Sequence, residues 1–171
     1  MSKNKIRKTK IMLKDPKKYR YIVGIDPSIS SNNSKKTGIC IYDQQDKKFN
    51  IFDINAADMI VNQIKENTFF ELPKEECLVL IENSNQSKRI RTGYNSRYSA
   101  RINQNAGKNL GVSELICQIF EVAKINFNSL PPNGYSKLFE DGDFFKQLLG
   151  FEKKYNKDVR AAVAIIYKNV L

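Results

Sequence analysis

Three acidic residues stand where apolar runs give way to polar sequence, and they are the side chains best suited to chemistry in this chain. Asp26 ends the run YIVGID, Glu82 follows the run CLVLI, and Asp158 stands near the start of NKDVRAAVAII. A carboxylate at the end of a buried strand is costly unless it is paired or bound to a cation. Spacing alone leaves two interpretations open: these acids are caps or surface residues, or they converge.

Converging carboxylates would form a hard oxygen site suited to Mg²⁺, with Mn²⁺ as a substitute. Two such ions about 3.5–4 Å apart can activate a water molecule and stabilise the leaving oxygen of a phosphodiester. The chain contains no histidine, which excludes Ser-His-Asp and Cys-His nucleophiles and His-ligated zinc. Chemistry here must therefore rest on carboxylates, lysines, hydroxyls or a hard metal ion, and no small-molecule cofactor is expected.

The three cysteines, Cys40, Cys77 and Cys117, stand far apart, each in an apolar run and without a CxxC pair. This spacing does not support a zinc knuckle or a redox motif. It favours small buried hydrophobic residues in a reducing compartment.

The elements that must position the acids follow from hydrophobic periodicity. We expect antiparallel strands over 19–26, 37–42 and 48–54, then a helix over 56–66. A continuous apolar run over 77–81 predicts a central parallel strand, covered on both faces. The remaining expected elements are a long helix, a short strand over 124–128, a short helix over 143–149 and a last helix from 156. The apolar stripe expected on the long helix consists of Leu110, Leu115, Ile116, Ile119, Phe120 and Ala123.

This order predicts an α/β fold with a mixed five-stranded sheet flanked by helices. If the first and fourth strands are neighbours, Asp26 and Glu82 project into one crevice. The last helix would then bring Asp158 to the same place.

The basic charge is concentrated at the N-terminus. The net charge is +11, and residues 1–20 carry nine Lys or Arg against Asp15 alone. We expect a flexible basic tail over 1–18 and a single domain over 19–171. Such a tail is attracted to phosphate backbones or to anionic membranes, or serves only to keep the chain in solution. No run approaches the roughly 18 apolar residues of a membrane span. No apolar signal segment opens the chain, so we expect a cytoplasmic, DNA-associated protein without membrane contact.

A second basic stretch follows Glu82 directly. From Asn83 to Ser113 the chain has six basic residues and no acid. Basic side chains contact phosphates and aromatic rings stack on bases, so this stretch is a candidate DNA-binding segment. A solvated loop and helix face is the alternative. The candidate residues are Lys88, Arg89, Arg91, Tyr94, Arg97, Tyr98, Arg101 and Lys108, with Lys137 as a further candidate for orienting a scissile phosphate.

The motifs GIDPS, TGICIYD and LIEN, with an aspartate opening the last helix, resemble the RuvC-type Holliday junction resolvases of the ribonuclease H-like superfamily. The resemblance covers about residues 20–171. It implies a ribonuclease H-like fold in which Asp26, Glu82 and Asp158 bind two Mg²⁺ ions. It also implies a homodimer that cuts four-way DNA junctions by phosphodiester hydrolysis. The Lys- and Asn-rich composition fits an AT-rich genome and a phage member of that family.

One departure from the family pattern bears on activity. The family's last helix carries Asp-x-x-Asp, but the second of these positions is Ala161 here. Two alternatives therefore stay open beside the junction-resolving endonuclease. One is a ribonuclease H-like enzyme acting on RNA–DNA hybrids, and the other is a junction-binding protein with a degenerate site.

Overall fold

The computed structural model describes residues 13–27, 37–54, 57–83, 86, 111–138, 142–150 and 155–171. The first twelve residues of the predicted basic tail lie outside this range, and so do the DNA-binding candidates between 88 and 108. The strands are β1 (Tyr21–Asp26), β2 (Thr37–Asp43), β3 (Lys48–Ile54), β4 (Thr68–Phe69), β5 (Leu72–Pro73), β6 (Cys77–Glu82) and β7 (Phe127–Leu130). The helices are η1 (Pro16–Lys18), η2 (Ala57–Gln63), η3 (Lys74–Glu76), the helical segment 111–122, α2 (Tyr135–Leu138), α3 (Gly142–Leu149) and α4 (Lys157–Asn169). None of the helices in the described ranges is long and apolar enough to cross a membrane.

Five strands form one mixed sheet in the order β3-β2-β1-β6-β7. β2 runs antiparallel to both β1 and β3, whereas β1, β6 and β7 run parallel to one another. The first five residues of β6 are buried, as expected for a parallel strand covered on both faces. The predicted α/β class and the mixed five-stranded sheet are confirmed.

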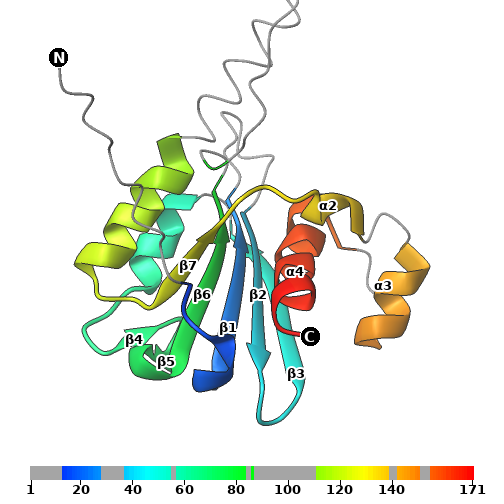
Figure 1. The fold of residues 1–171 in the computed structure, drawn as a ribbon, viewed down its shortest axis with the longest axis horizontal. Coiled ribbons are helices and arrows are strands. Elements are labelled where there is room, and N and C mark those ends of the chain that lie inside the picture. The colour runs from blue at the N-terminus through cyan, green and yellow to red at the C-terminus, as the bar shows by residue number, and fades with distance from the viewer. Residues whose placement is uncertain are drawn as a thin grey trace, which may run out of the picture.

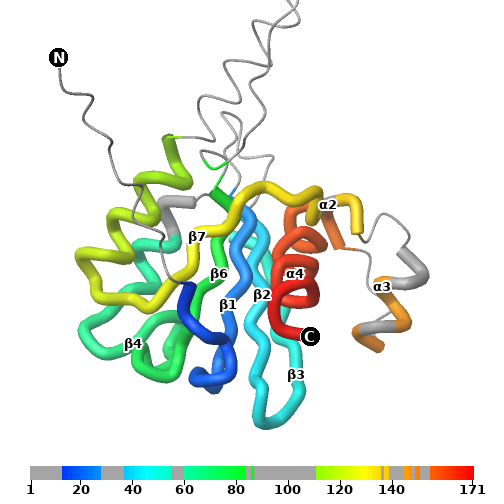
Figure 2. Tube along the Cα trace, viewed as in Figure 1, coloured from blue at the N-terminus to red at the C-terminus, as the bar shows by residue number. Residues whose placement is uncertain are grey.

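Helices cover both faces of the sheet, and each face has its own apolar core (Figure 1). Alternate residues of one strand enter different cores: Ile22 packs on the α4 side, and Val23 packs on the side of helical segment 111–122. The tube in Figure 2 shows α4 running along the sheet from its start near the carboxyl ends of β1 and β6. The first turn of α4 and the ends of these strands therefore meet at one end of the sheet.

Two glycines allow α4 to lie directly on the sheet. A Cβ atom at Gly24 of β1 would lie 2.3 Å from the carbonyl oxygen of Ala162, and one at Gly38 of β2 would lie 2.1 Å from that of Asp158. Any larger residue would force the helix away, because real Cβ atoms do not approach backbone atoms closer than 3.0 Å. Ala162 is itself small and fully buried. Small residues on both elements thus fix how α4 sits over β1 and β2.

The strand predicted over 124–128 is misplaced, because β7 begins at Phe127. Residues 123–125 are used to end the preceding helix. Lys124 adopts a left-handed φ of 55°, and the amide of Ile125 donates to the carbonyl oxygen of Phe120 over 2.9 Å. Strand pairing with β6 can start only after this turn.

The helix predicted over 56–66 is a 3-10 helix, η2, that stops at Gln63. Ile64 instead bridges Phe69 in the small hairpin of β4 and β5, so the chain reverses where the helix was expected to continue.

The apolar stripe expected on the long helix is wrong in part. Leu115 is 54% exposed, whereas Ile116 and Phe120 are buried.

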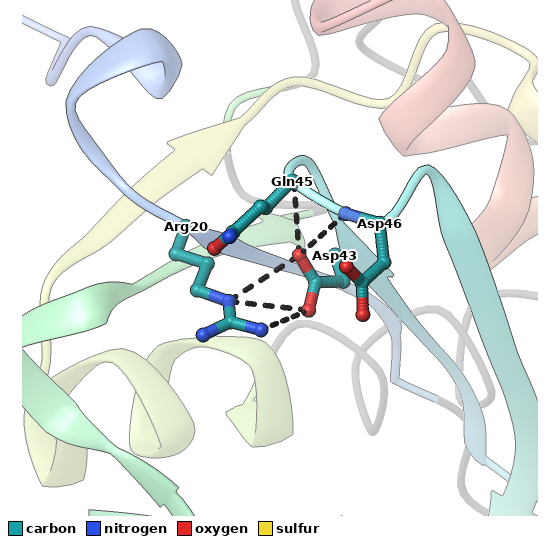
Figure 3. A network of polar contacts seen from close by, with 4 residues as sticks. All are labelled: Arg20, Asp43, Gln45 and Asp46. Atoms are coloured by element: carbon teal, nitrogen blue, oxygen red, sulfur yellow. Dashed lines mark hydrogen bonds and ion pairs between the residues drawn. The ribbon is translucent and has the colours of Figure 1, made fainter.

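The end of the sheet away from the carboxyl ends of β1 and β6 is closed by a polar network (Figure 3). The guanidinium of Arg20 donates to the Asp43 carboxylate over 3.0 Å, and that carboxylate also accepts from the backbone amides of Gln45 and Asp46. These contacts hold the turn between β2 and β3. The hydrogen-bonded ion pair with Arg20 also lowers the pKa of Asp43. We assign Asp43 a structural role in this turn.

The edge strand β7 is held from outside by the segment that precedes β1. The Asn128 side chain donates to the carbonyl oxygen of Lys14 and accepts from its amide, each over 2.8 Å. The Lys14 ammonium also donates to Asn126 over 2.8 Å. This segment therefore covers part of an edge that would otherwise present unpaired backbone groups.

Candidate active site

Asp26 and Glu82 end neighbouring parallel strands. Ile25 of β1 is in register with Ile81 of β6, so the two carboxylates are the next residues along each strand. Adjacent strands lie about 4.8 Å apart, and residues in register project from the same face of the sheet. The amide of Asn83 donates to the carbonyl oxygen of Leu130 over 2.7 Å, which pins the backbone directly after Glu82.

Asp158 reaches this pair because α4 begins over β2. Gly38 is the cross-strand partner of Asp26, and the backbone of Asp158 and Val159 lies where a Gly38 side chain would be. Asn156 caps α4 by accepting from the amide of Val159 over 2.9 Å. The structure therefore brings the start of α4 next to Asp26.

The charges of the other two acids act on Asp26. Burial is the main reason that the pKa of Asp26 lies well above its usual range, and the negative charges of Glu82 and Asp158 raise it further. Burial also raises the pKa of Glu82. The positive charge of Lys157 acts in the opposite direction on both groups. Repulsion of this kind among carboxylates is typical of functional sites and is relieved by a bound cation.

The donor set fits a hard divalent cation, since it consists of carboxylate oxygens without nitrogen or sulfur. The three residues suit such a cation by the type and charge of their ligand atoms. Within the described ranges, no three His, Cys, Asp or Glu side chains are already gathered closely enough to hold a metal ion. A cation would thus draw Asp26, Glu82 and Asp158 together from neighbouring positions.

Ala161, where the resembling family has a second helix aspartate, lies in the core. It is 1% exposed and packs in the cluster between α4 and the sheet. A carboxylate at this position would enter an apolar environment, so α4 offers Asp158 alone to the site.

Of the predicted DNA-binding residues, Lys137 alone falls within the described ranges. It is exposed on α2. The other candidates, Lys88, Arg89, Arg91, Tyr94, Arg97, Tyr98, Arg101 and Lys108, lie outside those ranges.

Two further residues near the acids were missed from the sequence. Lys157 precedes Asp158, and its charge acts on both Asp26 and Glu82. Tyr135 opens α2, and the pKa of its buried hydroxyl is raised by burial and also by the charge of Glu82. The sequence could have indicated Lys157, because it is next to the candidate ligand Asp158 in the first turn of the last helix. Tyr135 has no such signal, because α2 is too short to be predicted.

The three cysteines are buried and form no disulfide, as predicted. Burial raises the pKa of the Cys77 thiol to about 12 and also raises that of Cys117. These thiols are small hydrophobic residues of the core and take no part in the site.

No protein-family profile and no curated protein sequence matches the chain. Among solved structures it is similar to T. thermophilus RuvC in complex with a Holliday junction substrate, at 15% sequence identity and a TM-score of 0.47. The alignment covers 85% of this chain and 89% of that one. A likeness of this degree says nothing about activity. The strand order and directions of this chain are those of the mixed five-stranded sheet that the sequence predicts.

Proposed function

We propose that this chain is a metal-dependent, structure-selective endodeoxyribonuclease that resolves four-way or otherwise branched DNA by phosphodiester hydrolysis. The observation that carries the proposal is that Asp26, Glu82 and Asp158 lie near one another: burial raises the pKa of Asp26, and the negative charges of the other two acids raise it further. Keeping three acids together in a partly buried place destabilises the apo protein, and a cation-dependent function explains why they are there.

In the proposed site, Asp26 and Glu82 would hold Mg²⁺ from the sheet and Asp158 would hold it from α4. When bound, Mg²⁺ would supply activation of a water molecule and stabilisation of the leaving oxygen. Lys157 offers a positive charge beside the carboxylates, where it can accompany the scissile phosphate.

The positive charge of the chain supports DNA as the proposed substrate. The net charge is +11, and the stretch that follows Glu82 carries six basic residues and no acid as far as Ser113. Phosphate contacts of this kind supply affinity for nucleic acid without sequence preference. The preference for a four-way junction rests on the sequence resemblance, and so does the proposal that two copies act together.

A panel of substrates tests the proposal. A four-way junction, a linear duplex of the same sequence and an RNA–DNA hybrid are incubated with the protein in Mg²⁺ or in EDTA. We expect metal-dependent cutting of the junction, with the duplex spared. Preferential cutting of the hybrid would favour the ribonuclease H-like alternative.

A binding protein without activity is the second candidate, and the buried Ala161 favours it, because the fourth family carboxylate is missing. Tight junction binding without cutting in either Mg²⁺ or Mn²⁺ would establish that alternative. The same panel, with Mn²⁺ and a measurement of junction binding added, separates all three functions.

A further inference from the structure

Asp53 lies in the same row of the sheet as the candidate ligands. Asp26 of β1 is paired with Gly38 of β2, and Gly38 is paired with Asp53 of β3. Residues paired in this way project from one face, so Asp53 is on the face that α4 covers. The row places this fourth acid on the far side of Gly38, across the position where α4 begins.

A hydrogen bond connects Asp53 to the start of that helix. The side-chain amide of Asn156 donates to Asp53 Oδ2 over 3.0 Å. The side-chain oxygen of Asn156 accepts from the amide of Val159 over 2.9 Å, and the backbone carbonyl oxygen of Asn156 accepts from the amide of Arg160 over 3.1 Å. Asn156 is therefore fixed both to β3 and to the first turn of α4, and Asp158 lies within that turn.

We infer that Asp53 is a positioning residue that acts through Asn156. By holding the cap of α4 against β3, it keeps the Asp158 carboxylate beside Asp26. Gly38 supplies the space for the helix, and Asp53 supplies the contact that fixes its position along the row. The consequence for cleavage rests on the proposed function, but the effect on the first turn of α4 does not.

A direct metal-ligand role for Asp53 is the competing explanation. Two strand spacings of about 4.8 Å separate β3 from β1, and the first turn of α4 lies over the strand between them. The Asp53 oxygen is also occupied by the Asn156 amide. A positioning residue needs only an oxygen acceptor, whereas a ligand for a divalent cation needs its negative charge.

Four variants separate the two roles. Asp53→Ala removes the acceptor, and Asp53→Asn keeps an acceptor oxygen without the charge. Asn156→Asp removes the donor and sets two carboxylates against each other. The double variant Asp53→Asn with Asn156→Asp restores the bond with donor and acceptor exchanged, and an aspartate still caps the helix. Asp46→Ala, an exposed acid in the turn at the opposite end of β3, is the matched control.

Cleavage of a four-way junction in Mg²⁺ is measured at saturating and limiting DNA. We expect Asp53→Ala and Asn156→Asp to lower kcat by about tenfold or more with little change in KM, since the reacting groups are misplaced while the DNA contacts remain. Asp53→Asn and the double variant should retain most of the wild-type kcat, and Asp46→Ala should match wild type. Loss of activity in Asp53→Asn as large as in Asp53→Ala would overturn the inference in favour of a required charge.

Amide hydrogen exchange at Val159 and Arg160 in the free protein supplies a readout that needs no activity. Exchange should be faster in Asp53→Ala and return towards wild type in the double variant. Unchanged exchange in Asp53→Ala would overturn the inference even if cleavage fell. A wild-type protein that cuts nothing but shows the expected exchange pattern would refute the proposed function and leave the positioning role supported.

Discussion

Replacing Gly38 with alanine should damage the site through the position of α4. A Cβ atom at this position would lie 2.1 Å from the carbonyl oxygen of Asp158, and 3.0 Å is the shortest approach that real Cβ atoms make. The start of α4 and β2 must therefore move apart by at least 0.9 Å, the difference between those two distances. Because the obstructing atoms belong to the backbone, no side-chain rotation can relieve the contact.

Two magnitudes follow from this displacement. Overpacking of this kind costs about 1–3 kcal/mol of folding free energy. Each kcal/mol lowers the Tm of a domain of this size by about 2–4 °C. A displacement of about 1 Å at the reacting groups lowers kcat by roughly 100-fold, while binding of the junction should change little. Thermal unfolding and single-turnover junction cleavage measure the two effects separately.

Two other glycines provide matched controls. Gly24→Ala meets the carbonyl oxygen of Ala162 at 2.3 Å, so it should be similarly destabilising, but the contact lies one helical turn away from Asp158. Gly111→Ala meets no atom within 4 Å and should be neutral or slightly stabilising. The reasoning is refuted if Gly38→Ala keeps both its stability and its activity. It is also refuted if Gly24→Ala loses as much activity at equal stability.

Three other predictions concern charge and assembly. The pKa of Asp26 is raised in the folded protein, so in EDTA the folded state should lose stability as the pH rises from the usual carboxyl value of 3.8 through the folded pKa. Asp26→Asn should remove part of that loss in urea unfolding, and an unchanged pH dependence would contradict the raised pKa of Asp26. Removing residues 1–12, which carry five Lys or Arg and no acid, should weaken binding to linear and branched DNA alike. It should also flatten the slope of log K against log salt by about 0.9 for each phosphate that the tail neutralises in the full-length protein, whereas weaker binding to junctions alone would show that the tail recognises structure. Light scattering should find a dimer, free or on junction DNA, because two symmetric cuts need two related sites, and a monomer in both conditions would rule this out.

Four of the five strands of the sheet, β1, β2, β3 and β6, were predictable because each is an uninterrupted or alternating apolar run. β3 has the bounds that the sequence indicates, and β1, β2 and β6 differ by one or two residues at an end. The end of η2 and the start of β7 were harder to predict. η2 ends early because Ile64 pairs with Phe69, and β7 starts late because Lys124 turns the chain. Both depend on contacts that periodicity does not contain.

Some residues of the candidate site could likewise be placed from the sequence, and others could not. Asp26 and Glu82 could be placed together because the carboxyl ends of neighbouring parallel strands share one edge. Asp53 could not be placed, because its role depends on the register between β2 and β3 and on where α4 crosses them. Ala161 could be recognised as a departure from the family pattern, but its burial in the core follows from how α4 packs.

We propose that Asp26, Glu82 and Asp158 form a site for divalent cations at which DNA is cut. Single-turnover cleavage of a four-way junction in Mg²⁺ by wild type and by Asp26→Asn, Glu82→Gln and Asp158→Asn tests it most directly. Each change keeps the size of the side chain but removes a negative ligand, so each should lower the rate by orders of magnitude while junction binding persists. Wild-type activity in any one of the three variants would contradict the assignment of that residue, and a wild-type protein that binds the junction but does not cut it would contradict the claim as a whole.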